Sequence, residues 1–81
     1  MRLSNKRTAA FLTTFGNAAR NKRQRLALSQ EALAETAEFD RTYISLLERG
    51  KRNPSLTNLC RLAAALNTTP SDLLKGITYG P

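Results

Sequence analysis

The sequence predicts an all-α fold, a compact single domain of five helices. Apolar residues recur at helical spacings of three, four and seven through most of the chain. Residues that favour helix N-termini precede the expected helices, at Ser29, Asp40, Ser55 and Thr69. No segment alternates apolar and polar residues as a half-buried strand does. With 81 residues, one domain is the most the chain can form, and folding buries roughly 60% of the surface of such a domain.

The first helix is expected from about Thr8 to about Arg25, because its apolar residues fall on one side: Phe11, Leu12, Phe15, Ala18, Ala19 and then Leu26. Residues 1–8 are expected to be a basic flexible arm or a frayed helix start, because Leu3 is their only large apolar anchor. Residues 9–77 would form the domain and residues 78–81 a loose tail. Gly16 should weaken the first helix by ~1 kcal/mol relative to alanine, unless close packing needs the missing side chain.

Two short helices follow in the middle of the chain. Ser29 is a suitable N-cap for a helix that ends near Ala37. Glu38 and Phe39 then connect to Asp40, which we expect to cap a third helix running to about Arg49. Ile44 and Leu47 should face inward in this third helix, and Gly50 stands where a left-handed C-cap is favoured.

The last two helices come after a short basic loop of Lys51, Arg52, Asn53 and Pro54. Ser55 is expected to cap a fourth helix whose apolar face consists of Leu56, Leu59, Leu62, Ala63 and Leu66. The segment from Thr69 to Asp72 resembles a capping box with proline at the first helical position. Leu73, Leu74 and Ile77 would complete a short fifth helix.

Composition limits the possible functions. Thirteen basic and six acidic residues give a net charge of +7, which makes polyanions the natural partners. No apolar run is long enough for a membrane span and no secretory signal is visible, so we expect a cytoplasmic protein with no membrane partner. One cysteine and no histidine make a metal site improbable, and we expect no cofactor and no small-molecule ligand. Without histidine or paired carboxylates, we expect no catalytic residues and no enzyme activity.

Two short helices joined by a tight turn form a helix-turn-helix, in which the second helix can enter the major groove of DNA. The sequence here resembles the Cro/lambda-repressor type of helix-turn-helix domain, also called the xenobiotic-response-element family, from roughly Phe15 to Leu74. The matching motifs are Ser29-Gln30, Leu33-Ala34, Tyr43-Ile44-Ser45, Glu48-Arg49-Gly50 and Pro54-Ser55-Leu56. Within the family, the run from Asp40 to Ser45, with Glu48-Arg49 and Arg52-Asn53, is similar to the controller proteins of restriction-modification systems.

The resemblance implies a lambda-repressor-like, sequence-specific transcriptional regulator that binds double-stranded DNA at a pseudo-palindromic operator as a homodimer. The expected base-reading residues are Arg41, Thr42, Ser45 and Leu46. Phosphate contacts are expected from Gln30, Tyr43, Lys51, Arg52 and Asn53. An ion pair between Arg23 and Glu48 should brace the helices, and the dimer interface would use Leu66, Leu73, Leu74 and Ile77.

The chain departs from the family pattern at three positions. Glu38 stands where the family often has glycine, at a position that tends to adopt positive φ, so strain of order 1 kcal/mol is expected there. Ala27 stands where glycine often ends the first helix, and Lys22 replaces a usually apolar residue. These departures affect the details of the turn and of the helix ends and leave the fold unchanged.

Several alternatives stay open. Tyr43 could pack between helices, Lys51 and Arg52 could be a solvated charged loop, and the basic arm could face water instead of DNA. The same module also occurs in antitoxins and in phage-type repressors. A further alternative from another class is a polyanion-binding or protein-interaction module that does not recognise sequence.

Overall fold

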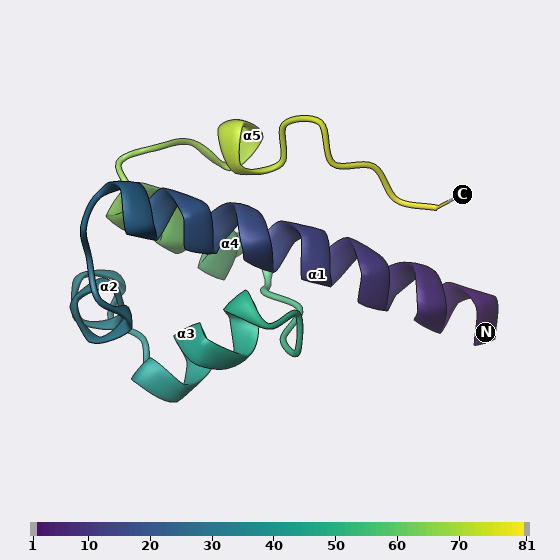
Figure 1. Ribbon diagram of the computed structural model, residues 1–81, viewed down its shortest axis with the longest axis horizontal. Coiled ribbons are helices and arrows are strands. Elements are labelled where there is room, and N and C mark those ends of the chain that lie inside the picture. The colour runs from purple at the N-terminus through teal and green to yellow at the C-terminus, as the bar shows by residue number, and fades with distance from the viewer. Residues whose placement is uncertain (1, 81) are drawn as a thin grey trace.

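The computed structural model describes residues 2–80, with side chains from Asn5 onward. It contains five α-helices and no strand within that range, so the predicted all-α fold is confirmed. In Figure 1, α1 crosses the molecule, with α2 and α3 on one side of it and α5 with the C-terminal segment on the other. The helices are α1 (Arg2–Arg25), α2 (Gln30–Ala37), α3 (Arg41–Glu48), α4 (Leu56–Ala65) and α5 (Pro70–Leu73).

The hydrophobic core draws on all five helices. Its residues are the ones that the helical periodicity places on inner faces, so packing, more than intrinsic propensity, stabilises these short helices. The largest fully buried side chains are Leu33 in α2, Ile44 and Leu47 in α3, Leu62 in α4, Leu66 just after it and Leu73 in α5. Phe15 and Ala19 of α1 pack against this cluster.

Helix α1 begins at Arg2, about two turns before the predicted start near Thr8. The predicted arm is therefore helical from Arg2 on, while Met1 and the side chain of Arg2 lie outside the described part of the chain. Near the other terminus, the Tyr79 hydroxyl lies 2.9 Å from the Thr8 hydroxyl, and the rings of Tyr79 and Phe11 pack edge to face with their centroids 5.9 Å apart. These contacts attach residues 78–80 of the predicted loose tail to α1; Pro81 lies outside the description.

Gly16 allows α1 to approach the end of α3 closely. A Cβ atom at this position would lie 2.6 Å from the carbonyl oxygens of both Leu47 and Glu48. Because these are backbone atoms, they cannot move aside cheaply. The missing side chain is therefore a packing requirement, which outweighs the cost of glycine in a helix.

Three of the four predicted N-caps use their side chains. The hydroxyls of Ser29, Ser55 and Thr69 accept hydrogen bonds from backbone amides in the first turn of α2, α4 and α5. Asp40 occupies the N-cap position of α3 with an extended backbone, but its carboxylate stays exposed and makes no capping hydrogen bond. The predicted N-cap position of Asp40 is therefore confirmed, without the hydrogen bond that the other three caps make.

After α3, Gly50 has φ 76°, the left-handed conformation predicted for it, but three other helix ends use left-handed residues that are not glycine. Glu38, the C-cap of α2, has φ 61°, as the family pattern led us to expect, and Ala27 has φ 58°. Asn67 has φ 56°, and asparagine tolerates this region. Glu38 and Ala27 have no such tolerance, so each costs of order 1 kcal/mol.

Candidate nucleic-acid interface

Helices α2 and α3 form a helix-turn-helix at the lower edge of the molecule in Figure 1. Three residues, Glu38 to Asp40, separate them, and the Phe39 amide donates to the Ala34 carbonyl at 2.8 Å to close the turn. Such a tight connection holds the second helix at a fixed angle to the first.

Helix α3 divides cleanly into an inner and an outer face. Ile44, Leu47 and Glu48 are buried. All four predicted base-reading residues lie on the outer part: Arg41 and Thr42 are exposed, and Ser45 and Leu46 are half-buried. Arg41 is in the first turn, where the helix dipole disfavours positive charge, so its side chain is poorly placed to stabilise the helix and well placed to bind an external anion or base edge.

The predicted phosphate contacts fall into two groups. Lys51, Arg52 and Asn53 are exposed in the loop between α3 and α4. Gln30 is instead engaged within the protein, because its Nε2 donates to Glu48 Oε1 at 3.1 Å. One of the two N–H donors of this nitrogen is used within the protein, and the other, together with the backbone amides at the start of α2, can still donate to a phosphate.

Tyr43 combines both of the roles considered from sequence. Its half-buried ring packs against Phe39, with ring centroids 4.8 Å apart. Its hydroxyl accepts a hydrogen bond from Asn58 Nδ2 at 3.2 Å, so the hydroxyl proton remains available to an external acceptor. Interhelical packing thus fixes the ring and does not exclude a phosphate contact.

Arg23 and Glu48 form the ion pair that the resemblance implies. Arg23 Nε lies 2.6 Å from Glu48 Oε2, and its NH2 nitrogen donates to Oε1 at 3.0 Å, a bidentate arrangement. The NH1 nitrogen of Arg23 donates to the Leu28 carbonyl at 2.8 Å. The two side chains are only 11% and 3% exposed. With Gln30 as the third donor to the carboxylate, this cluster joins α1, α2 and α3 away from water.

Arg61 was not identified from the sequence as a residue of this region. From α4 it donates two hydrogen bonds to the turn, to the carbonyls of Ala37 at 2.8 Å and Glu38 at 2.7 Å. Its guanidinium carbon lies 4.3 Å from the centre of the Phe39 ring. A contact with backbone carbonyls leaves no pattern in the sequence that could predict it. The one available signal was that Arg61 is the charged residue of an otherwise uncharged helix.

Lys22, which replaces a usually apolar residue, pairs with Asp72 at 2.6 Å and so links α1 to α5. The Thr68 hydroxyl donates to the same carboxylate at 2.6 Å. The hydrogen bond from Lys22, supported by that from Thr68, holds the pKa of Asp72 below its ordinary value of 3.8.

The predicted dimer residues need a correction. Leu66 and Leu73 are each only 2% exposed within a single chain, because they fill the core, so they cannot contact a partner. Leu74 and Ile77 are half-buried and keep some accessible surface. Leu56, which was assigned to the inner face of the fourth helix, is 77% exposed.

The lining of an apolar groove of about 120 Å³ includes Pro54 and Leu59, which flank Leu56 in the sequence. The groove is lined by Phe11, Leu12, Phe15, Asn53, Pro54, Leu59 and Leu74. The groove and Leu56 together give the surface both a recess and a projecting apolar side chain at the start of α4.

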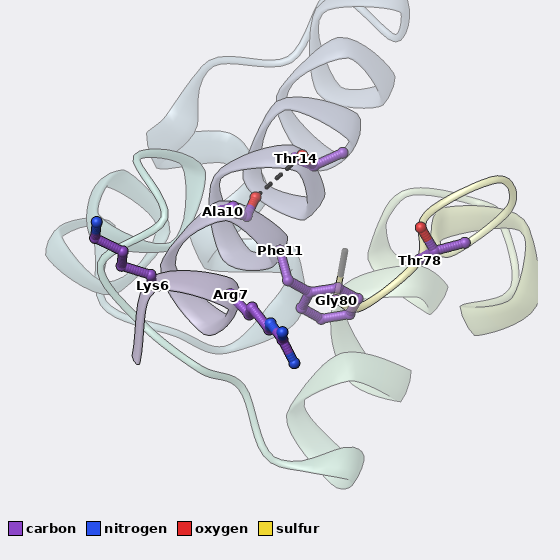
Figure 2. Close-up of a pocket in the computed structure, with 7 residues that line it drawn as sticks. All are labelled: Lys6, Arg7, Ala10, Phe11, Thr14, Thr78 and Gly80. Carbon is purple, nitrogen blue, oxygen red and sulfur yellow. Dashed lines mark hydrogen bonds between the residues drawn. The ribbon is translucent and has the colours of Figure 1, made fainter. Parts of the chain in front are cut away.

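A separate pocket of about 260 Å³ lies between α1 and the C-terminal segment. In Figure 2, Lys6 points away from the Phe11 ring and Thr78 lies on the far side of it, so that of these charged and polar side chains only Arg7 extends beside the ring. Ligand sites require polar groups that converge. This pocket therefore does not compete with α2 and α3 as the candidate site.

Two kinds of site receive no support from the described residues. Nowhere in residues 2–80 do three or more of the side chains that commonly bind metals lie close enough to hold an ion. Over the same range, no helix has the length and apolar character needed to cross a membrane.

Comparison with known proteins gives a consistent result. A family model described as helix-turn-helix matches residues 20–73. Control protein C.MunI of Mycoplasma sp is 44% identical over 64 residues, which cover 78% of this chain and 86% of that protein. Control protein C.BamHI of Bacillus amyloliquefaciens is 49% identical over 53 residues, which cover 65% of each. The crystal structure of the restriction-modification controller protein C.AhdI from Aeromonas hydrophila superposes with a TM-score of 0.78 at 45% identity, covering 79% of this chain and 97% of that one.

Proposed function

We propose that this chain, which belongs to the helix-turn-helix (HTH_3) family of DNA-binding transcriptional regulators, is the controller of a restriction-modification system. In this role it would bind a pseudo-palindromic operator as a homodimer. Its relatives include proteins named as control proteins and as transcriptional regulators, not enzymes. The observation that carries the proposal is the outer face of α3, which exposes Arg41 and Thr42 at its start while its inner face is fixed to α1 and α2.

Base recognition would come from this outer face. The guanidinium of Arg41 suits bidentate hydrogen bonds to O6 and N7 of guanine in the major groove. Thr42 and Ser45 can donate to or accept from base edges, and Leu46 can contact a thymine methyl group. A good bidentate pair is worth about 1–3 kcal/mol of discrimination against the wrong base. We therefore expect Arg41 to make the largest contribution to specificity.

Phosphate contacts would place α3 in the groove. The exposed loop residues Lys51, Arg52 and Asn53 follow the C-terminal end of α3, and the amides at the start of α2 lie at the other end of the motif. Contacts of this kind fix orientation and carry no sequence information. The Tyr43 hydroxyl would donate to a phosphate between them.

A homodimer would form on the surface around Leu56. An isologous contact requires that one surface be complementary to itself, and the exposed Leu56, with the apolar groove lined by its sequence neighbours Pro54 and Leu59, would offer both parts of such a contact. Leu74 lines the groove and Ile77 lies near it in the sequence. Two copies of α3 would then enter successive major grooves about 34 Å apart.

Selection of bound duplexes from a random pool tests the DNA part of this proposal. The expected product is a pseudo-palindrome, and Arg41→Ala should relax one position of each half-site. Binding should be repeated between 50 and 200 mM salt, because phosphate contacts alone lower affinity ~10³–10⁵-fold over that range for any sequence. A protein that loses all preference as salt rises would be a polyanion-binding module.

Sedimentation equilibrium tests the dimer. Leu56→Asp should shift the protein towards monomer and weaken operator binding without unfolding it, since Leu56 is exposed within a single chain. The control is Leu26→Asp, at another exposed leucine, which should leave the dimer intact. Equal dimer populations in Leu56→Asp and the wild type would contradict the assigned surface.

A further inference from the structure

Arg61 contacts three consecutive residues of the turn that joins α2 to α3. One of its terminal nitrogens donates to the carbonyls of both Ala37 and Glu38, at 2.8 and 2.7 Å, and its guanidinium covers the ring of Phe39 at 4.3 Å. Because the guanidinium is planar, it can donate hydrogen bonds in its plane to the two carbonyls while its flat face stacks on the Phe39 ring. A lysine could not make this set of contacts.

The turn is a part of the fold that needs such support. Glu38 adopts a left-handed conformation that disfavours a residue with a side chain. Ala37 and Glu38 also end α2, where carbonyl groups lack partners within the helix and the helix dipole is negative. A positive charge that donates to both carbonyls therefore stabilises this particular geometry of the chain.

A chain of contacts continues from the turn to the start of α3. The Phe39 ring packs on Tyr43, in the first turn of α3, and the Tyr43 hydroxyl accepts from Asn58 of α4. Helix α3 otherwise packs against α1 and α2. In addition to the shared core, the side chains of Arg61 and Asn58 thus connect α4 to the N-terminal end of α3, where Arg41 and Thr42 lie.

We propose that Arg61 is a positioning residue for base recognition. It holds the turn and the first turn of α3 in the orientation that directs Arg41 and Thr42 towards the major groove, and it does not itself touch DNA. The DNA-binding part of this inference rests on the proposed function; the hold on the start of α3 is a property of the protein without DNA.

Amide hydrogen exchange on the DNA-free protein tests directly whether Arg61 stabilises the turn and the start of α3. Arg61→Met should accelerate exchange at Phe39 and Ile44, whose amides donate to Ala34 and Asp40. The amide of Lys51, which donates to Leu46 beyond the other end of α3, should exchange as in the wild type. Equal acceleration at all three sites would mean general destabilisation and would overturn the inference, as would no acceleration at any of them.

Operator binding tests the consequence for recognition. Arg61→Met should weaken binding to the selected operator about tenfold, equivalent to about 1.4 kcal/mol, while binding to a random duplex and its salt dependence stay unchanged. Arg25→Met is the matched control: it removes the same charge from a site beside Asp72 and Leu73, and should change neither affinity. An equal loss of affinity for the operator and for the random duplex would identify Arg61 as a phosphate contact and refute its positioning role. In that case the slope of log affinity against log salt concentration would also decrease in magnitude by about one.

Rescue by a second substitution separates positioning from simple loss of stability. Glycine adopts the left-handed conformation freely, so Glu38→Gly in the Arg61→Met background should restore most of the operator affinity. Failure of this rescue would refute the mechanism. A wild-type protein without sequence preference would instead refute the proposed function, and the exchange result would then decide whether Arg61 holds α3.

Discussion

Removing Arg23 should destabilise the fold more than removing Glu48. In Arg23→Met, the Glu48 carboxylate, 3% exposed, would keep only the hydrogen bond from Gln30 at 3.1 Å. Leaving a buried charge without its partner costs about 3–5 kcal/mol. In Glu48→Gln, Arg23 is more exposed at 11% and keeps the Leu28 carbonyl, so a smaller cost of about 1–3 kcal/mol is expected.

Thermal and urea unfolding measure the difference. For a domain of this size, each kcal/mol shifts Tm by roughly 4–8 °C, so Arg23→Met should lower Tm by about 12 °C or more. The double variant should cost less than the sum of the two single changes, because the second removes the charge that the first left unpaired. Arg25→Met on the same helix is the control, with an expected cost below about 1 kcal/mol. If Arg23→Met and Glu48→Gln both unfold like the wild type, the ion pair does not brace the three helices.

Three further changes test other features of the fold. Gly16→Ala should destabilise by about 1–3 kcal/mol in urea unfolding despite the better helix propensity of alanine, because the new Cβ meets the Leu47 carbonyl at 2.6 Å; a stabilised variant would contradict this close approach. Glu38→Gly alone should raise the free energy of unfolding by up to about 1 kcal/mol by removing left-handed strain, and an unchanged Tm would argue against that strain. Because the pKa of Asp72 is lowered on folding, its link to Lys22 stabilises the protein above pH 3.8 and is lost as pH falls below that value. Lys22→Met should therefore be less stable than the wild type at pH 7, and the difference in the free energy of unfolding should shrink as pH falls below 3.8.

The parts of the fold that the sequence predicted depend on local rules. Ser29 and Ser55 are N-caps because each hydroxyl accepts a hydrogen bond from the backbone amide three residues later, which has no partner within the helix. Both groups lie within one turn, so the sequence shows the relation. The left-handed turn at Glu38 and the Arg23–Glu48 pair came from the resemblance, and the structure contains both. Helical periodicity predicted that Ile44 and Leu47 face inward in α3, and the resemblance assigned Arg41, Thr42, Ser45 and Leu46 to its outer face.

The parts that sequence did not predict depend on distant contacts. Periodicity places Leu56, Leu66 and Leu73 on apolar faces, but tertiary packing covers two of them and leaves Leu56 exposed. The acceptors of Arg61 are carbonyl groups 23 and 24 residues away, and every residue type provides a carbonyl. The two extra turns at the start of α1 consist mostly of polar residues without an apolar pattern, so no periodicity marked them.

The position of Glu48 has a consequence for changing the DNA specificity of this protein. Arg23 of α1 and Gln30 of α2 fix the C-terminal end of α3 through Glu48. The turn, held by Arg61, fixes the N-terminal end, so both ends of the helix are held in place. None of these supports uses the side chains of Arg41, Thr42 or Ser45. Those positions can be exchanged for other residues as a set, and the backbone that presents them should keep its orientation.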